Sequence, residues 1–342
     1  MTISGPGVSG AELDTAAVTA PRTGRRKAPR AGLPRKLTPD YISFLAVFFV
    51  LPVALFLVFV IWPFIQAVYV SLTNWTGFSP NMSFVGLDNF VRLFQDSAFM
   101  QAMANNALLA VVVPLVTIVI ALLFASLITV GGPSHGQVRG LRGSTFYRVV
   151  SFFPYVIPAI VIAILWNMIY APSGLLNGVL GVFGIDTNQF AWLGDQRTAM
   201  AASIFVMVWG MVGFYMVLFI AAIKGIPAET LEAARIDGAG RFRTVTSIML
   251  PQIRDNVQTS YIYLGIAALD AFVYMAGLNS TGGPNNSTLV MSQYLFRTAF
   301  EKGQFGLATA MGVVLAVLSL AFAGIVMLVF RLIGGKDEGG RS

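Results

Sequence analysis

The sequence has no cysteine and a single histidine, His135. Disulfides, thiolate catalysis and cysteine-bound metals are therefore excluded, and so is a metal site built from several imidazoles. Charged side chains are also scarce, at 11% of 342 residues, less than half of their share in an average soluble domain. Because 56% of the residues are hydrophobic, more than a soluble core can bury, we expect the chain to have a lipid bilayer as its solvent.

A phosphate-binding loop is also missing from the sequence. The two nearest stretches, GGPSHG and GGKDEGG, lack the Gly-Lys-Ser/Thr that holds the phosphates of a nucleotide. We therefore expect this chain to bind no cofactor and no metal, and to carry out no catalysis. If ATP drives its activity, the nucleotide is bound by another chain.

What the sequence does contain is a set of long apolar segments with almost no charge. A helix that crosses a bilayer of about 30 Å needs about 20 such residues. Six segments meet this requirement, with approximate bounds 41–72, 104–130, 149–170, 198–223, 257–278 and 305–330. The sequence therefore predicts an all-α integral membrane protein with six transmembrane helices.

Lysine and arginine are divided unevenly between the two sides that these spans define. Of the 22 such residues, only Arg92, Arg197, Arg297 and Lys302 lie in the loops of one side. The other side holds the rest and both termini, because the number of spans is even. Positive residues collect in cytoplasmic segments, so we predict a multi-pass protein with cytoplasmic termini. Because the basic residues follow the topology, we expect no nucleic-acid partner.

The segments outside the spans predict three regions. Residues 1–40 are rich in Ala, Pro, Gly, Thr and Arg without an apolar period, which predicts a disordered basic cytoplasmic tail. Residues 41–333 form the transmembrane domain, and residues 334–342 form a short cytoplasmic tail. The run RTGRRKAPRAGLPRK before the first span either contacts anionic membrane lipid or only fixes the orientation of the chain.

The loop 224–254 combines charge and turn signals in an otherwise apolar chain. Pro227 suits the first turn of a helix, where its missing N–H costs nothing. Glu229 and Glu232 follow in the first turns, where carboxylates favour the helix dipole. We expect Leu231, Ala234 and, more loosely, Ile236 to form an apolar stripe on this helix.

A break and a second helix follow this first helix. Gly238 has the conformational freedom that a helix end needs, and a second short helix is expected over 241–249. A short helix with a small-residue face that turns sharply into another is a docking element. The alternative is a loop helix that packs only on its own bundle.

The spacing within this loop resembles a family pattern. Glu232-Ala233-Ala234, Gly238, and Ile248-x-Leu250-Pro251 match the EAA loop of permease subunits in bacterial ABC importers. The stretches SLTNW and FVGLDNFVRLFQDSAF after the first span, and STGGPNNSTLVMSQYLFRTAF after the fifth, resemble the carbohydrate-uptake, maltose-type branch. The resemblance covers about 41–330.

The resemblance implies a type I ABC importer permease fold in the bacterial plasma membrane. It implies four kinds of partner: a second permease subunit, two cytoplasmic ABC ATPase subunits that bind ATP, an extracytoplasmic solute-binding protein, and membrane lipid. It also assigns ATPase coupling to residues of the charged loop, namely Glu229, Glu232, Ala233, Ala234, Asp237, Gly238, Arg241, Leu250 and Pro251. The charged loop is thus expected to be the mechanical joint between the ATPases and the permease.

The substrate path is expected to use polar and aromatic residues of the spans. Asp270 is the only ionisable residue inside a span, where its charge costs several kcal/mol unless it faces protein or water. Asp270 either contacts substrate hydroxyls or serves a structural role. Related permeases commonly have an acidic residue after a phenylalanine at this place, whereas in this chain Asp270 precedes Phe272, so the residue departs from the family pattern. Amides and aromatic faces also bind sugars. The candidate path residues are Asn106, Asn167, Tyr215, Tyr263 and Asp270.

Two alternatives remain. A permease of the same architecture could import a non-sugar solute such as a polyamine or phosphate. A secondary transporter or channel would need more intramembrane charge for ion coupling than one aspartate, and no inverted repeat is visible.

Overall fold

The computed structural model describes residues 39–80, 82–130, 143–185, 187 and 189–334. The two predicted tails therefore lie outside the described residues, apart from residues 39, 40 and 334. Within the described ranges the chain is helical, and its only β pairing is an isolated bridge between Thr73 and Phe84. The chain divides into two units, residues 1–60 and 61–342.

The first unit contributes one apolar helix. It runs through α1 (Pro39–Leu45), the π-helical η1 (Ala46–Val50) and α2 (Leu51–Phe56), and continues as η2 (Leu57–Ile61) into the second unit. None of its residues is buried. A helix that is apolar on every side and buries nothing presents its side chains to lipid or to another subunit.

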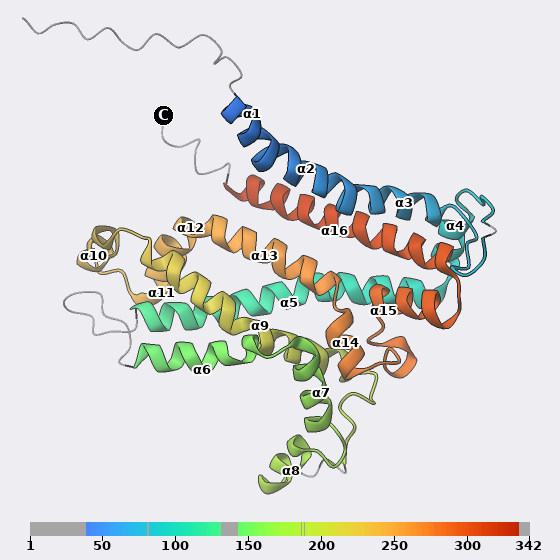
Figure 1. The fold of residues 1–342 in the computed structure, drawn as a ribbon. Helices are drawn as coiled ribbons and strands as arrows, with labels where there is room; N and C mark the ends of the chain where they lie inside the picture. The colour runs from blue at the N-terminus through green and yellow to red at the C-terminus, as the bar shows by residue number, and fades with distance from the viewer. Residues whose placement is uncertain (1–38, 81, 131–142, 186, 188, 335–342) are drawn as a thin grey trace, which may run out of the picture. The chain divides into compact units, whose positions relative to one another are not determined.

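The second unit is built around a few long helices, α3 (Trp62–Ser71), α5 (Ser97–Val130), α9 (Ala199–Lys224), α13 (Arg254–Leu269) and α16 (Phe305–Gly334). The central α5 packs against α9 and α13, while α16 packs against α3 and α13 (Figure 1). Among the described residues, four helical segments, of which the first is Pro39–Ser71, are long and apolar enough to cross a membrane singly. The predicted six spans are reached when each of two bent helix pairs counts as one span.

These two spans are broken. In the third, α6 (Ser144–Val156) and α7 (Ala159–Ile169) meet at an angle of 96°, and in the fifth, α13 and α14 (Phe272–Leu278) meet at 49°. Pro158 explains the first bend, since it forces the preceding residue out of the helical region; Ile157 is extended, with φ −77° and ψ 133°. Hydropathy alone located both spans but not their breaks.

Short helices lie at the ends of the spans. At one end of the second unit are α10 (Ala228–Ile236), α11 (Arg241–Arg243), the π-helical η3 (Thr244–Met249) and α12 (Leu250–Gln252). At the opposite end are α4 (Asp88–Gln95), η4 (Pro284–Asn286), α15 (Met291–Phe296) and η5 (Arg297–Glu301). A further helix, α8 (Leu175–Val182), follows α7. Figure 1 shows α10 and α4 at opposite ends.

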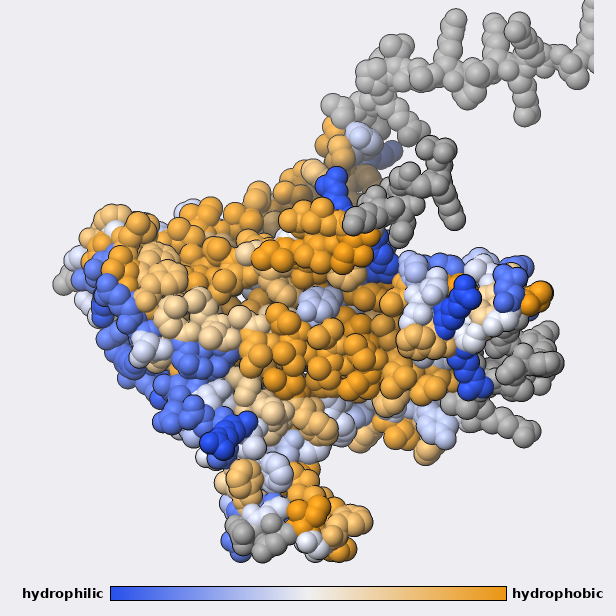
Figure 2. All heavy atoms as spheres, turned by 180° about the vertical axis from the view of Figure 1, so that it is seen from behind, coloured by the Kyte–Doolittle hydropathy of each residue, from blue (hydrophilic) through white to orange (hydrophobic). Residues whose placement is uncertain are grey.

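The surface of the spans is apolar, as a protein in lipid requires. Large side chains such as Leu320 and Val317 of α16 are 75% and 60% exposed. Figure 2 shows hydrophobic side chains over the middle of the molecule and hydrophilic ones gathered towards its ends. The expected division into an apolar belt and polar ends is thus present in the structure.

Candidate functional site

The first part of the site is the loop that follows α9. Leu231 and Ala234 of α10 are 7% and 6% exposed, so one face of this helix is buried as the apolar stripe predicts. Leu231 belongs to the same buried cluster as Phe219 of α9, Met249 and Ile253. Burying a leucine contributes about 1.5–3 kcal/mol. The loop is therefore packed against the core of the spans.

A left-handed residue ends α10. Gly238 has φ +74°, and the backbone N–H of Ala239 donates to the carbonyl of Ala234 at 2.9 Å. This bond closes a Schellman-type helix end, which glycine adopts at the lowest cost. A Cβ at Gly238 would meet no atom within 4 Å, so the demand for glycine comes from the backbone conformation alone.

The chain then reverses into α11. The N–H of Thr244 donates to the carbonyl of Gly240 at 2.9 Å, and the buried Thr244 hydroxyl donates to the same carbonyl at 3.1 Å. The expected second helix over 241–249 is thus present, as α11 followed by η3. Backbone conformation and local hydrogen bonds thus fix the turn between the two arms of the loop.

Several of the predicted coupling residues share an exposed surface. Glu229, Glu232, Ala233 and Asp237 are all exposed, and Gly238 and Arg241 follow them at the turn. Two large apolar side chains join them, because Ile236 is 86% exposed and Phe242 is 82% exposed. An uncovered surface that combines carboxylates with apolar side chains is suited to docking another protein.

The structure corrects one detail of this prediction. Ile236 is 86% exposed and is not part of the buried stripe, because it follows Leu231 by five positions and at about 100° per residue points to another side of the helix. Of the other predicted coupling residues, Ala234 faces the bundle. Leu250 and Pro251 belong to α12, just before the fifth span, and line an apolar groove.

The second part of the site is a cavity between α6, α9 and α13. Its volume is about 590 Å³, and Tyr155, Phe214, Tyr215 and Tyr263 contribute aromatic rings to it. Tyr155 and Phe214 are stacked, with ring centroids 4.6 Å apart. The polar lining comes from one helix, through Asp255, Asn256, Thr259 and Ser260 of α13. Aromatic faces opposite hydroxyl, amide and carboxylate groups can bind a hydroxylated solute.

Close contact between two backbones places these rings. A Cβ at Gly213 of α9 would lie 1.8 Å from the carbonyl oxygen of Ser151 in α6, which is not possible sterically. Gly213 therefore lets α6 and α9 approach each other next to Phe214. The stacked pair of Tyr155 and Phe214 lies beside this contact and depends on it.

The structure brings together some of the predicted path residues. Tyr215 and Tyr263 both line the cavity, and the exposed Asp270 ends α13 three positions after the lining residue Ala267. Asp270 therefore lies next to the cavity, at the break of the fifth span, and not among the residues that line it.

Asn106 and Asn167 lie outside this cavity. Asn106 is fully buried; its amide donates to the carbonyl of Leu269, and its oxygen accepts from the N–H of Met291 at 2.8 Å. Asn167 donates to the carbonyl of Leu278 at 2.7 Å. These three hydrogen bonds connect the spans to α13, α14 and α15, which is a structural role for both residues, and neither lines the cavity.

Sequence reasoning missed most of the polar lining of the cavity. Asn256, Thr259, Tyr263 and Asp270 recur at intervals of three, four and seven, which is the spacing of one helical face. This spacing is a signal in the sequence for a polar stripe on one face of the fifth span. Tyr155 and Phe214 carried no such signal, because their contact depends on the approach of α6 to α9.

Comparison with known proteins identifies the family. Residues 128–334 match the profile of the family described as "Binding-protein-dependent transport system inner membrane component". The chain belongs to this family. It is thus a permease component of a binding-protein-dependent transport system and a multi-pass inner-membrane protein, as the EAA spacing predicted.

Individual relatives agree with this assignment. The chain is 59% identical over 325 residues to the diacetylchitobiose uptake system permease protein NgcF of Streptomyces coelicolor, covering 93% of this chain and 92% of the relative. It is 31% identical to the multiple sugar-binding transport system permease protein MsmF of Streptococcus mutans, covering 79% and 89% of the two chains.

A solved structure agrees with the predicted fold. A chain of the bacterial alginate ABC transporter, solved in complex with its alginate pentasaccharide-bound periplasmic protein, superposes with a TM-score of 0.72. The match covers 86% of this chain and 96% of that chain at 24% identity. The predicted type I ABC importer permease fold is confirmed.

Proposed function

We propose that this chain is one of two permease subunits of an ATP-driven importer that moves a sugar or oligosaccharide. An extracytoplasmic binding protein delivers the solute, and two cytoplasmic ATPase subunits bind and hydrolyse ATP. The cavity between α6, α9 and α13 carries the proposal, because it sets aromatic rings opposite hydroxyl, amide and carboxylate groups.

The cavity suits a path that a second subunit completes. Tyr263 is 67% exposed although it lines the cavity, so this wall of the path is open in the single chain. The second permease would supply the opposite wall. Closing the path between two subunits allows it to open alternately to either side when they move.

The proposed solute is an uncharged oligosaccharide, with diacetylchitobiose as the first candidate because it is named in the relative that is 59% identical. The apolar faces of its sugar rings would stack on Tyr155 and Tyr263, and its hydroxyl and acetamido groups would bond to Asn256 and Thr259. Ser260 also lines the cavity and is 2% exposed, and its hydroxyl oxygen has no hydrogen-bond partner among the described residues.

The charge of the cavity distinguishes between the two alternative solutes. Among the described residues, the cavity lining includes Asp255 and no lysine or arginine, and Asp270 lies beside it. Two carboxylates disfavour phosphate. They favour a cation, which makes a polyamine the second candidate.

The loop from Lys224 to Arg254 would be the joint to the ATPase. Glu232 and Ala233 would contact the ATPase directly, with Ile236 and Phe242 as apolar anchors. Because Leu231 is buried with the core of the spans, a displacement of this surface would be transmitted to α9 and α13. The proposal includes a cytoplasmic position for the loop and for both termini.

The test is uptake by the complete complex in proteoliposomes that contain ATP and the binding protein. Labelled diacetylchitobiose should accumulate, and unlabelled spermidine or phosphate in excess should not compete. Competition by spermidine would favour the polyamine alternative. Uptake driven by an ion gradient without ATP would favour a secondary transporter and contradict the proposal.

A further inference from the structure

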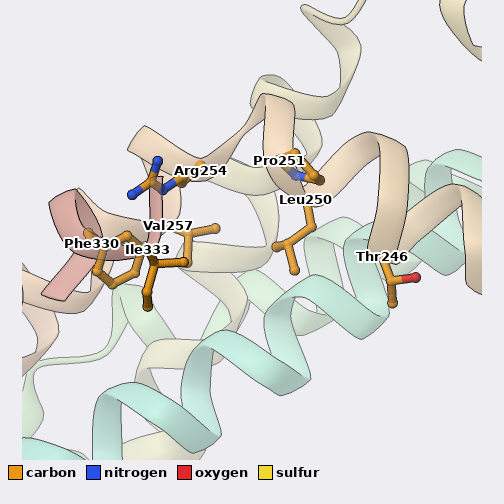
Figure 3. Close-up of a pocket in the computed structure, with 7 residues that line it drawn as sticks. All are labelled: Thr246, Leu250, Pro251, Arg254, Val257, Phe330 and Ile333. Atoms are coloured by element: carbon orange, nitrogen blue, oxygen red, sulfur yellow. The ribbon is translucent and has the colours of Figure 1, made fainter. Parts of the chain in front are cut away.

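We propose that an apolar groove at the cytoplasmic end of the fifth and sixth spans binds an anionic phospholipid, whose phosphate is held by Arg254. The groove has a volume of about 310 Å³. Leu250 and Pro251 of α12, Val257 of α13, and Phe330 and Ile333 of α16 line it (Figure 3). Its position in the cytoplasm rests on the orientation proposed above.

The charge of the groove is positive. Its only ionisable lining residue among those described is Arg254, whose guanidinium carbon lies 5.9 Å from the ring centroid of Phe330. The adjacent Asp255 lines the solute cavity instead. Successive residues of α13 thus direct a carboxylate to the path and a guanidinium to the groove. A guanidinium binds phosphate through paired, charge-assisted hydrogen bonds.

The groove also opens on an apolar surface. Leu332 and Ile333, at the end of α16, are each 65% exposed, and Leu250 is 37% exposed. An arginine at the end of a span, beside exposed apolar side chains, lies at the depth of lipid phosphates. A phospholipid can fill the groove with an acyl chain and pair its phosphate with Arg254 at the same time.

The tails of the chain fit this groove poorly. The segment 335–342, which directly follows α16, has the sequence GKDEGGRS and contains no apolar side chain to fill the groove. The segment 22–36 is basic and would be repelled by Arg254. A lipid is the occupant that satisfies both the apolar lining and the charge.

A lipid bound in the groove would make the coupling between the ATPase and the permease depend on the charge of the membrane lipid. Thr246 of η3 lines it together with Leu250, and both belong to the loop that is proposed to meet the ATPase. A bound lipid would therefore brace the end of this loop against α13 and α16. Transport should then be faster in membranes that contain anionic lipid. This effect on transport rests on the proposed function, whereas the binding of lipid to the groove does not.

The experiment measures phosphatidylglycerol retained by the purified complex, using mass spectrometry without solute or ATP. Arg254→Gln should lower retention about tenfold, the loss of a charge-assisted contact. Ile333→Trp, made at an exposed position, should fill the groove and lower retention of both phosphatidylglycerol and phosphatidylcholine. The matched control is Arg331→Gln, which removes a charge one residue from Phe330 without altering the groove lining, and it should retain lipid like wild type.

Three results would overturn the proposal. One is unchanged retention in Arg254→Gln. Another is an equal loss in Arg331→Gln, which would mean general attraction to surface charge. The third is displacement of the lipid by glycerol phosphate, which has the headgroup but no acyl chain, since the site would then bind a free phosphate. Failure of sugar uptake with normal lipid retention would count only against the proposed function.

Discussion

The side-chain amide of Asn106 in α5 donates a hydrogen bond to the carbonyl of Leu269, the last residue of α13. The same side chain accepts the N–H of Met291, the first residue of α15. One buried amide thus satisfies a carbonyl left without a helical partner at the break in the fifth span, and an N–H left without one at the start of α15. The break is a stable feature because Asn106 of α5 supplies a hydrogen-bond donor to the carbonyl of Leu269 that α13 itself does not.

The two hydrogen bonds of Asn106, which we call the clamp, can be tested with Asn106→Leu. This substitution preserves the side-chain volume but removes both bonds. Each buried group left unsatisfied costs about 1–3 kcal/mol, so we expect a clear decrease in the thermal stability of the purified complex. The comparison variant is Asn167→Leu, which loses one bond from an exposed side chain and should cost less. Equal stability of Asn106→Leu and wild type would show that the clamp is not required.

The left-handed turn at Gly238 predicts a graded series of variants. Gly238→Leu should strain the backbone by about 1 kcal/mol or more and turn the docking helix away from its partner. Gly238→Asn should be tolerated better, since asparagine adopts this conformation more readily. The measurement is ATP-driven uptake by the reconstituted complex. Wild-type uptake in Gly238→Leu would exclude a role for this turn in coupling.

Glu232→Ala tests the docking surface itself. The lost contact with a basic group on the ATPase is worth about 1.5–3 kcal/mol if well formed, so ATPase association or the coupling of hydrolysis to uptake should fall. Solute capture by the separate binding protein should not change. The matched control is Glu301→Ala, at the opposite end of the spans, where the carboxylate pairs with Arg297 at 3.6 Å. The same loss in both variants would count against docking at Glu232.

The solute path predicts different effects for a ring and for a charge. Tyr263→Ala should raise the solute concentration needed for half-maximal uptake, whereas Tyr263→Phe should retain most activity if the ring face makes the contact. Asp270→Asn should change solute preference or apparent affinity while the complex still assembles. Uptake kinetics equal to wild type in Asp270→Ala would remove this residue from the path.

The predicted topology can be examined by cysteine labelling, because the chain has no cysteine of its own. Residues Ser247 and Thr76 are both exposed, at opposite ends of the second unit. An impermeant reagent should label Thr76→Cys in intact cells and should label Ser247→Cys only after the membrane is opened. The reverse pattern would invert the orientation and with it the proposed ATPase contact.

A tyrosine of α15, outside the spans, predicts a change in stability at alkaline pH. Burial raises the pKa of Tyr294 from 10.0 to about 12, and its hydrogen bond to Asp96 adds to this shift. Below pH 10 the neutral phenol contributes fully. As the pH rises from 10 to about 12, the unfolded tyrosine ionises first, so the contribution is lost. Tyr294→Phe should lack this loss in denaturation measured across the same range.

Hydropathy in the sequence was sufficient to locate the spans, and the residue spacing of the charged loop was sufficient to indicate the family. These properties are local: a bilayer selects about 20 apolar residues at a time, and turn chemistry acts over a few residues. The helix at 228–236 and the reversal at Gly238 were therefore predictable. The exposure of Ile236 was also within reach, because the helical period alone separates it from Leu231.

Only the tertiary structure decided which polar residues form the site. Asn106 meets Leu269 across 163 residues, and only the fold shows this hydrogen bond. The stacked rings of Tyr155 and Phe214 depend on the backbone approach at Gly213, which no pattern along one helix reveals. A span can be predicted from its own segment because each span must present enough apolar residues to cross the hydrocarbon core. A cavity, in contrast, exists only where several helices meet.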